Sequence, residues 1–264
     1  MPKPHEVSTV AEAWELVLLP GMDGTGILLE GLLAVLPPQV AVTVVRYPPR
    51  ERRSFDELVS LAAAQLPQGK PLVLVGESFS GPVVVELIRR YRPRLWAVVF
   101  CVTFARTPRA LVANLIPLLP LDELLGVRPP RWAVKGICLG QKIGEESLER
   151  FYRAMDQVAP TVLVQRLHIL AGIDVLRALE VVNVPCLYLQ AAQDRMIPAH
   201  CLEPFRRALP QLQVTRIPGP HFLLEARPEA AWGAVNDFIA RLPPPPGVPE
   251  TSATQALEGQ RKTL

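Results

Sequence analysis

The residues best suited to chemistry lie in the segment 76–81, Gly-Glu-Ser-Phe-Ser-Gly, which follows an apolar run at 72–75. A serine at the tip of a tight strand-to-helix turn is forced into a strained backbone, so small residues are needed two positions before and after it. Gly76 and Ser80 meet that need around Ser78. The start of the following helix also directs its amide dipoles at a developing negative charge. The segment therefore predicts Ser78 as a nucleophile.

Two alternatives stand beside this interpretation. Ser80 is a rival nucleophile, but its second neighbours are Ser78 and Pro82, and it would lie inside the helix instead of at the turn. The whole segment could also be an ordinary glycine-containing turn whose serine caps the helix.

A serine hydroxyl needs an adjacent base to become nucleophilic at neutral pH. His221 follows the last predicted strand in a turn rich in glycine and proline, at the carboxyl end of a strand, where ligands gather in open α/β sheets. It is the predicted base. The other histidines are less suitable, because one is near a terminus, one is on a helical face and one is early in a helix: His5, His168 and His200.

The acid that orients the base should follow another strand, between the serine and the histidine in the chain. Asp194 follows the apolar run 186–191 and is the predicted acid, although it could instead cap the helix that begins near Pro198. Asp174 precedes a helical stretch like an N-cap, and Asp156 lies within a helix.

An oxyanion hole needs two backbone donors, and the amide of Phe79 is the first predicted one. The second is the amide of Met22, in the glycine-rich loop 19–26 after the first strand. That loop could instead bind phosphate. However, it lacks the third glycine of a dinucleotide fingerprint, and no acidic residue ends the next strand.

These residues must be positioned by a mostly parallel sheet with helices on both faces, since short apolar runs alternate with helical stretches. The predicted strands are 16–19, 40–47, 72–75, 95–104, 186–191 and 213–217. The predicted helices are 28–36, 55–66, 81–91, 199–209 and 229–242.

The alternation breaks between residues 107 and 180, where amphipathic stretches at 145–158 and 161–170 have no strand between them. A helical insertion of this length is too large for a simple crossover, so we expect a cap over the sheet edge, lined in part by the leucine-rich stretch 111–125. The predicted division is a core domain of 1–106 and 181–242, a helical cap of 107–180 and a disordered tail of 243–264.

The loop 19–26, the elbow 76–81 and the segment 219–225 together resemble the α/β-hydrolase superfamily, in a small bacterial esterase-like branch. They also resemble the acyltransferase-like domain of plant phytyl ester synthases. The resemblance covers residues 16–242 and implies a Ser-His-Asp triad, an acyl-enzyme intermediate and no cofactor. Two departures are visible. Pro20 stands where a histidine usually braces the oxyanion loop, and the missing first hairpin predicts six strands instead of eight.

Composition excludes several other classes. Charged residues make up 20% of the 264 residues, and the net charge of +3 comes from scattered arginines, so we expect no nucleic-acid partner. The densest basic group, Arg50, Arg52 and Arg53 beside Glu51, is interpreted as a solvated loop. No signal peptide or membrane-spanning segment is predicted, and the cysteines lack metal-site spacing, so a cytoplasmic location without a metal is expected.

The predicted function is hydrolysis of a small, apolar carboxylic ester by a serine esterase. An acyltransferase, a thioesterase or a hydrolase of carbon–carbon bonds would use the same three residues. A non-catalytic binding protein on the same scaffold is the alternative from another class. The sequence does not distinguish these possibilities.

Overall fold

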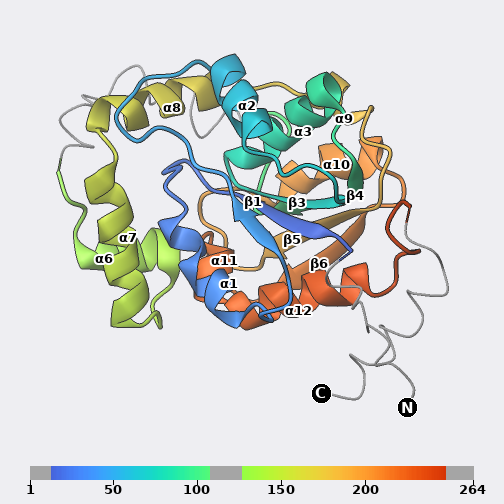
Figure 1. Cartoon of the computed structure of the whole chain (residues 1–264). Helices are drawn as coiled ribbons and strands as arrows, with labels where there is room; N and C mark the ends of the chain where they lie inside the picture. Colours follow the sequence, from blue (N-terminus) through green and yellow to red (C-terminus); the bar gives the residue numbers. More distant parts are fainter. Residues whose placement is uncertain (1–12, 108–126, 248–264) are drawn as a thin grey trace, which may run out of the picture.

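The computed structural model of the chain describes residues 13–107 and 127–247. Its centre is a six-stranded sheet (Figure 1) in the order β2-β1-β3-β4-β5-β6. Every pair of neighbouring strands is parallel. The strands are β1 (Glu15–Leu19), β2 (Val42–Val44), β3 (Leu72–Glu77), β4 (Leu95–Cys101), β5 (Cys186–Ala191) and β6 (Gln213–Ile217). The sheet confirms the predicted fold class and the six strands.

Helices cover both faces of the sheet (Figure 1). On one face lie α2 (Phe55–Ala64), α3 (Ser80–Tyr91), α9 (Leu176–Leu179) and α10 (Glu203–Ala208). On the other lie α1 (Glu30–Val35), which follows the short helix η2 (Ile27–Leu29), and α11 (Leu223–Ala226) and α12 (Pro228–Ile239). The expected helix at 199–209 is divided into η5 (Ala199–Leu202) and α10.

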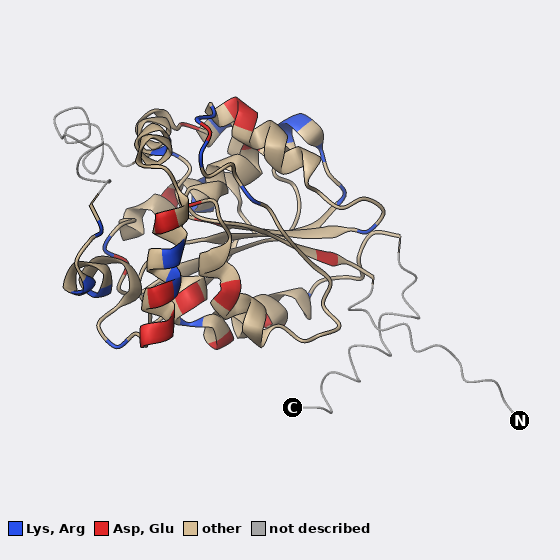
Figure 2. Cartoon of the chain, turned by 60° about the vertical axis from the view of Figure 1, so that its left-hand side comes forward, with Lys and Arg blue, Asp and Glu red and all other residues tan. Residues whose placement is uncertain are grey.

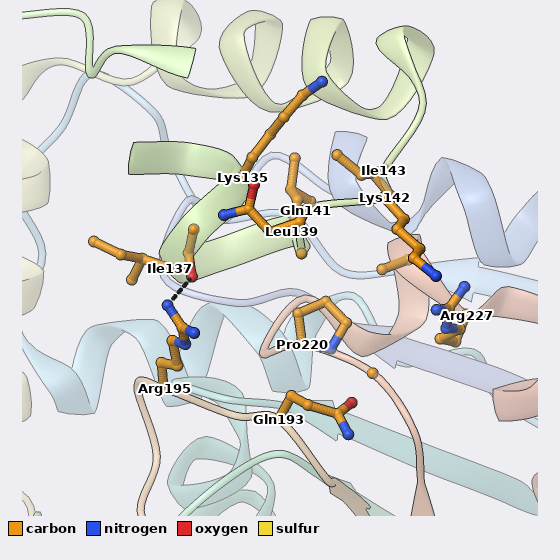
Figure 3. Close-up of a pocket in the computed structure, with 14 residues that line it drawn as sticks. Lys135, Ile137, Leu139, Gln141, Lys142, Ile143, Gln193, Arg195, Pro220 and Arg227 are labelled. Atoms are coloured by element: carbon orange, nitrogen blue, oxygen red, sulfur yellow. Dashed lines mark hydrogen bonds between the residues drawn. The ribbon is translucent and has the colours of Figure 1, made fainter. Parts of the chain in front are cut away.

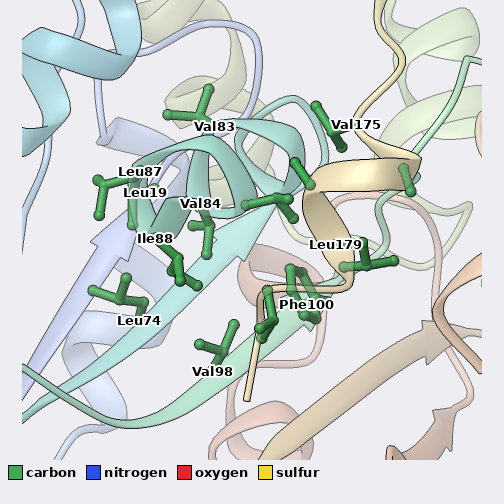
Figure 4. Close-up of a cluster of buried hydrophobic side chains, with 14 of the residues drawn as sticks. Leu19, Leu74, Val83, Val84, Leu87, Ile88, Val98, Phe100, Val175 and Leu179 are labelled. Atoms are coloured by element: carbon green, nitrogen blue, oxygen red, sulfur yellow. The ribbon is translucent and has the colours of Figure 1, made fainter. Parts of the chain in front are cut away.

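The inner strands β1, β3, β4 and β5 read as mostly apolar runs because each face of the sheet has its own core. The first core lies under α2, α3, α9 and α10, and the second lies under α1, α11 and α12. In β1, Val17 and Leu19 point into the first core and Leu16 and Leu18 into the second, as the two-residue period of a strand requires. Figure 4 shows part of the first core, where side chains of β1, β3 and β4 meet those of α3 and α9. Burial on both faces removes the polar alternation that a half-exposed strand would show.

Two predicted strands are longer than the observed ones. The run 40–47 contains only the three residues of β2, which is an edge strand with Val42 37% exposed and two prolines beyond it. Edge strands are commonly short, which limits pairing with other chains. The run 95–104 ends as β4 at Cys101, because Val102 adopts a φ of +44° that no strand can accommodate.

Between β4 and β5 the described residues form helices, which we call the helical insertion (residues 127–179). These are α6 (Arg131–Ala133), the π-helix η4 (Val134–Leu139), α7 (Glu145–Gln157), α8 (Pro160–Gly172) and α9. Most of the leucine-rich stretch expected to line a cap lies in residues 108–126, outside the described residues. Most of the predicted tail, residues 248–264, also lies outside the described residues. At its start, the Pro243 carbonyl accepts from the Trp96 Nε1–H at 2.9 Å.

The described helices include none that is both long and apolar enough to cross a bilayer. All four cysteines carry free thiols, and Cys101, Cys186 and Cys201 are buried. The division into core, cap and tail stays a prediction.

We expect Phe205→Ala to destabilise the protein by about 3–5 kcal/mol, because truncation leaves a cavity in the first core. Phe205 is fully buried on α10, and its ring centre lies 4.8 Å from that of Phe100 and 5.3 Å from that of Tyr188. Urea unfolding measures the change, with Ile137→Ala, at a 48% exposed position, as the control near zero. A loss below about 1 kcal/mol for Phe205→Ala would contradict this packing role.

Candidate active site

Ser78 occupies the turn between β3 and α3 with a left-handed backbone, φ +49°. Few residues other than glycine adopt this conformation without support. The support comes from β4 and the loop beyond it: the Ser78 N–H donates to the Cys101 carbonyl at 2.9 Å, and the Thr103 hydroxyl donates to the Ser78 carbonyl at 2.5 Å. The strained elbow that the motif predicts is therefore present.

Small residues around the elbow are required by close packing. A Cβ on Gly76 would lie 3.0 Å from the Ser80 carbonyl oxygen, and one on Gly81 would lie 2.1 Å from the Thr103 hydroxyl oxygen. Ser80 itself is buried, and its hydroxyl donates to the Pro20 carbonyl at 2.5 Å and lies 2.7 Å from the Tyr47 hydroxyl. Ser80 therefore joins the elbow to the neighbouring loop.

The structure brings Ser78, His221 and Asp194 into one hydrogen-bonded chain. The His221 Nε2 lies 3.0 Å from the Ser78 Oγ, and the His221 Nδ1 lies 2.9 Å from the Asp194 Oδ2. When Nδ1 carries the proton it donates to the carboxylate, and Nε2 is then free to accept from the hydroxyl. His221 is 3% exposed, so this chain is shielded from water on most sides.

The loop after β5 holds the Asp194 carboxylate in place. Its Oδ1 accepts from the N–H groups of Met196 and Ile197, both at 2.8 Å, and Oδ2 remains for His221. The capping alternative is thus limited to one oxygen and to the turn before η5. One carboxylate performs both tasks without competition between them.

The rival residues lie elsewhere. Asp174 pairs with Arg106 and accepts from the Leu176 N–H at the start of α9, and Asp156 pairs with Arg128. His168 and His200 are exposed, and His5 lies outside the described residues.

The two predicted oxyanion donors follow β1 and β3, which are neighbours in the sheet. Strand order changes direction at this point, because β2 lies on one side of β1 and β3 on the other, and such switch points form crevices at carboxyl ends. Met22 lies in a turn closed by the Gly24 N–H on the Gly21 carbonyl at 3.1 Å. Within the described chain, the N–H groups of Met22 and Phe79 donate to no protein acceptor.

Sequence reasoning missed Arg166, a buried arginine on α8 of the helical insertion, 2% exposed. Its Nη1 donates to the carbonyls of Met22 at 2.9 Å and Asp23 at 2.7 Å. Its Nη2 donates to the Pro48 carbonyl at 2.9 Å. A signal was present: Arg166 shares a helical face with the apolar residues Val162 and Leu163, where a charge requires buried partners.

Glu77, directly before the predicted nucleophile, was also missed. It is buried at the end of β3, and burial raises its pKa to about 8, with further raising by the nearby carboxylates of Asp23 and Glu225. Burial also raises the pKa of Asp23, whose carboxylate accepts from the Thr25 N–H and hydroxyl. A charged residue in an otherwise apolar strand was the available signal. No group of three acidic, histidine or cysteine side chains in the described residues could hold a metal ion.

Charged side chains attach the helical insertion to the segment after His221. Glu225 on α11 is buried, and its carboxylate accepts from Arg150 of α7 at 2.9 Å and from the Gly31 N–H at 3.0 Å. Arg150 and Arg153 also pair with Glu30 on α1. Figure 2 shows basic and acidic residues gathered on this side of the molecule.

A pocket of about 400 Å³ lies between η4 and the loops that carry Asp194 and His221 (Figure 3). Its basic lining residues are Lys135, Lys142, Arg195 and Arg227, and none of the described residues that line it is acidic. At its edge, the Arg195 Nη1 donates to the Gly136 carbonyl at 3.0 Å, as the dashed line in Figure 3 shows. Ser78 does not line this pocket, so the pocket is separate from the predicted nucleophile.

We expect Glu77→Gln to remove a pH dependence of stability. The pKa of Glu77 in the folded protein is about 8, above the ordinary 4.5, so the folded state holds this proton more tightly than the unfolded state does. The resulting contribution to the stability of the folded protein is complete below about pH 4.5 and is lost as the pH rises to about 8. The free energy of unfolding of the glutamine variant, relative to that of the wild type, should therefore increase between pH 5 and 8.5, by on the order of 1–4 kcal/mol. Urea unfolding at both pH values measures it, and a constant difference would contradict the burial argument.

Comparisons with known proteins bear on the fold and the family of the chain. Phytyl ester synthase 1 of Arabidopsis thaliana, described as chloroplastic, is 31% identical over 125 residues, which cover 44% of this chain and only 17% of that protein. Three solved structures share the fold, each with a TM-score of 0.69. A lipase-esterase related protein from Clostridium acetobutylicum is 14% identical and covers 88% of this chain and 96% of its own.

The other two are an enol-lactonase from Burkholderia xenovorans, 16% identical over 86% of this chain and 91% of its own, and a thermophilic esterase from Thermogutta terrifontis, 20% identical over 86% and 88%. At such identities these structures support the fold alone. The family match is broader, because the Alpha/beta hydrolase family matches residues 16–234. With its parallel sheet and a serine elbow at the carboxyl edge, the chain belongs to the alpha/beta hydrolase family.

Proposed function

We propose that this protein is a serine hydrolase of carboxylic esters, in which Ser78 is the nucleophile, His221 the general base and Asp194 the orienting acid. The observation that carries the proposal is the pair of hydrogen bonds, 3.0 Å from Ser78 to His221 and 2.9 Å from His221 to Asp194. Both lie in the range that proton transfer in acyl chemistry requires. The order of the three residues along the chain is also the order typical of this family.

In the proposed mechanism the Ser78 hydroxyl attacks the ester carbonyl while the His221 Nε2 takes its proton. The tetrahedral intermediate collapses when His221 returns that proton to the leaving alcohol, and an acyl-serine remains. Water then attacks the acyl group with His221 again as the base, which releases the acid and restores the serine. Asp194 holds the imidazole in the required tautomer and stabilises its positive charge.

The oxyanion of that intermediate would accept from the N–H groups of Met22 and Phe79. The Phe79 N–H is at the amino end of α3, where the helix dipole is positive, and Phe79 has a helical backbone. Fixed donors of this kind stabilise the transition state more than the ground state.

We propose an apolar ester as the substrate class. The Met22 side chain packs against Val158, Val162 and Leu163 of the insertion, so the region above the oxyanion loop is apolar. The similar structures include a thermophilic esterase and an enol-lactonase. The free thiols of the four cysteines also favour a reducing compartment, and we propose the cytoplasm.

A second candidate function is acyl transfer to a lipophilic alcohol, favoured by the similarity to phytyl ester synthase 1. The same acyl-serine would form, and an alcohol instead of water would accept the acyl group. Incubation of the acylated protein with water and a long-chain alcohol in competition distinguishes the two. Ester as the main product would identify a transferase, and free acid a hydrolase.

A binding protein without catalysis is the alternative from another class. Thioester hydrolysis and carbon–carbon bond hydrolysis remain within the same chemistry and are tested with the matching substrates. A fluorophosphonate probe separates catalysis from mere binding, because only an activated serine reacts with it quickly. Failure of Ser78 to label would favour the binding protein.

We expect Ser78→Ala to lower kcat on p-nitrophenyl esters by roughly 10³–10⁶-fold while the thermal midpoint stays close to that of the wild type. The loss follows because no nucleophile remains, although the oxyanion donors do. Initial rates over a series of acyl chain lengths measure the effect and define the preferred acyl group. Wild-type rates in the variant would contradict the assignment.

Asp194→Asn should lower kcat by about 10⁴-fold, because the amide favours the wrong tautomer of His221. The matched control is Asp174→Asn, the competing acid, which pairs with Arg106 at the surface. We expect the control to keep a rate within about twofold of the wild type. Equal losses in both variants, measured as kcat at saturating ester, would refute the orienting role of Asp194.

A further inference from the structure

We infer that Arg166 is a positioning residue for the oxyanion hole: a guanidinium from the helical insertion fixes the turn that presents the Met22 N–H. This inference rests on the proposed function. Arg166 touches no reacting atom in it and acts through the backbone of residues 22 and 23. The argument follows from which peptide units the guanidinium holds.

The Met22 N–H belongs to the same planar peptide unit as the Gly21 carbonyl, and the two point in opposite directions. The Gly21 carbonyl accepts from the Gly24 N–H at 3.1 Å inside the turn, so the Met22 N–H must point out of the turn. The next two peptide units carry the carbonyls of Met22 and Asp23, and Arg166 Nη1 holds both, at 2.9 and 2.7 Å. Every peptide unit between Gly21 and Gly24 is thereby fixed.

The guanidinium is built into the loop. Gly24 has a φ of +72°, and a Cβ there would lie 2.7 Å from the Arg166 Nη1, so the turn leaves room for the guanidinium only with glycine at this position. Nη2 reaches the Pro48 carbonyl at 2.9 Å, which ties the turn to the segment after β2. Among the described residues, Arg166 has no carboxylate partner within ion-pair distance.

A buried cation that donates only to neutral carbonyls is costly for stability. Desolvation opposes its charge and lowers its pKa, and the nearby Asp23 carboxylate, which favours the charge, offsets this only in part. Its position has a use in the proposed reaction. The charge lies one peptide unit away from the N–H that would receive the oxyanion, where a positive charge stabilises a developing negative one. The positioning role thus gives a reason for a charge that packing does not require.

The other end of the same loop is held from the core. The Ser80 hydroxyl, paired with the Tyr47 hydroxyl at 2.7 Å, donates to the Pro20 carbonyl. The resemblance to the α/β-hydrolase superfamily implies that Pro20 stands where a histidine usually braces this loop. Arg166 and Ser80 together supply the bracing that a histidine there would give.

The test compares Arg166→Met, Arg166→Lys and the control Gln165→Met in the full chain. Gln165 is the neighbouring residue on α8, and its amide oxygen accepts from Arg52 Nε at 3.3 Å, away from the oxyanion loop. Steady-state kinetics on a p-nitrophenyl ester gives kcat and KM separately, corrected for the folded fraction. Hydrogen–deuterium exchange of the peptide spanning residues 20–25 reports on the turn without any need for activity.

We expect Arg166→Met to lower kcat by about 10²-fold with KM within about threefold, because the loss falls on the transition state. Arg166→Lys restores charge but cannot bridge three carbonyls, so kcat should be intermediate and exchange of residues 20–25 should still be faster than in the wild type. Gln165→Met should match the wild type in both measurements. If Arg166→Met does not fold, Arg166→Lys decides by the same two readouts.

The inference is overturned if the arginine variants keep kcat within threefold of the wild type, if the loss lies only in KM, or if exchange in residues 20–25 is unchanged. Failure of the proposed function has a different signature. In that case Ser78→Ala would leave the measured activity intact, while faster exchange in Arg166→Met would still show that the arginine holds the turn.

Discussion

The left-handed backbone of Ser78 is the constraint on which the rest of the site depends. It lifts the hydroxyl out of the sheet at the end of β3, an inner strand with β1 on one side and β4 on the other. The conformation is held by hydrogen bonds from β4 and the residues beyond it, and by packing so close that Gly76 and Gly81 have no room for a Cβ. Strain of this kind persists only where the surrounding structure over-determines it. The two-sided core of the parallel sheet provides that surrounding.

The helical insertion is attached to each of the three loops that meet at this serine. Arg166 of α8 binds the loop after β1, and the Gly136 carbonyl of η4 accepts from Arg195 in the loop after β5. Arg150 of α7 binds Glu225, four residues after His221. In each contact an arginine side chain connects two segments far apart in the sequence. A planar group with five donors is suited to this, because it can satisfy several buried acceptors at once. The helical insertion is thus part of the support of the candidate site.

The sequence was sufficient for the sheet, the elbow and the choice of Ser78, Asp194 and His221, because each depends on a local pattern: an apolar run followed by a turn with small residues. The structure brings these three side chains together, and their catalytic roles stay a prediction. The length of β2 was not readable, since exposure at the sheet edge is a tertiary property. Arg166 was missed because its partners are backbone carbonyls, and Glu77 because its unusual pKa comes from burial. Neither leaves a pattern in the spacing of side chains along the sequence. Each is a charge in an apolar setting, which is the trace that such residues do leave.

The fully parallel sheet also has a temporal consequence. The serine and the two predicted oxyanion donors follow the amino-terminal strands β3 and β1, whereas the carboxylate follows β5. The imidazole follows β6, which in the described part of the chain is an edge strand paired with β5. During synthesis on the ribosome the hydroxyl is made long before the imidazole that would activate it. Parallel pairing across such distances is slow, because each strand must wait for a crossover to fold. In the proposed mechanism, a nascent chain therefore carries an inert serine, and reactivity would arrive only when the last strand docks.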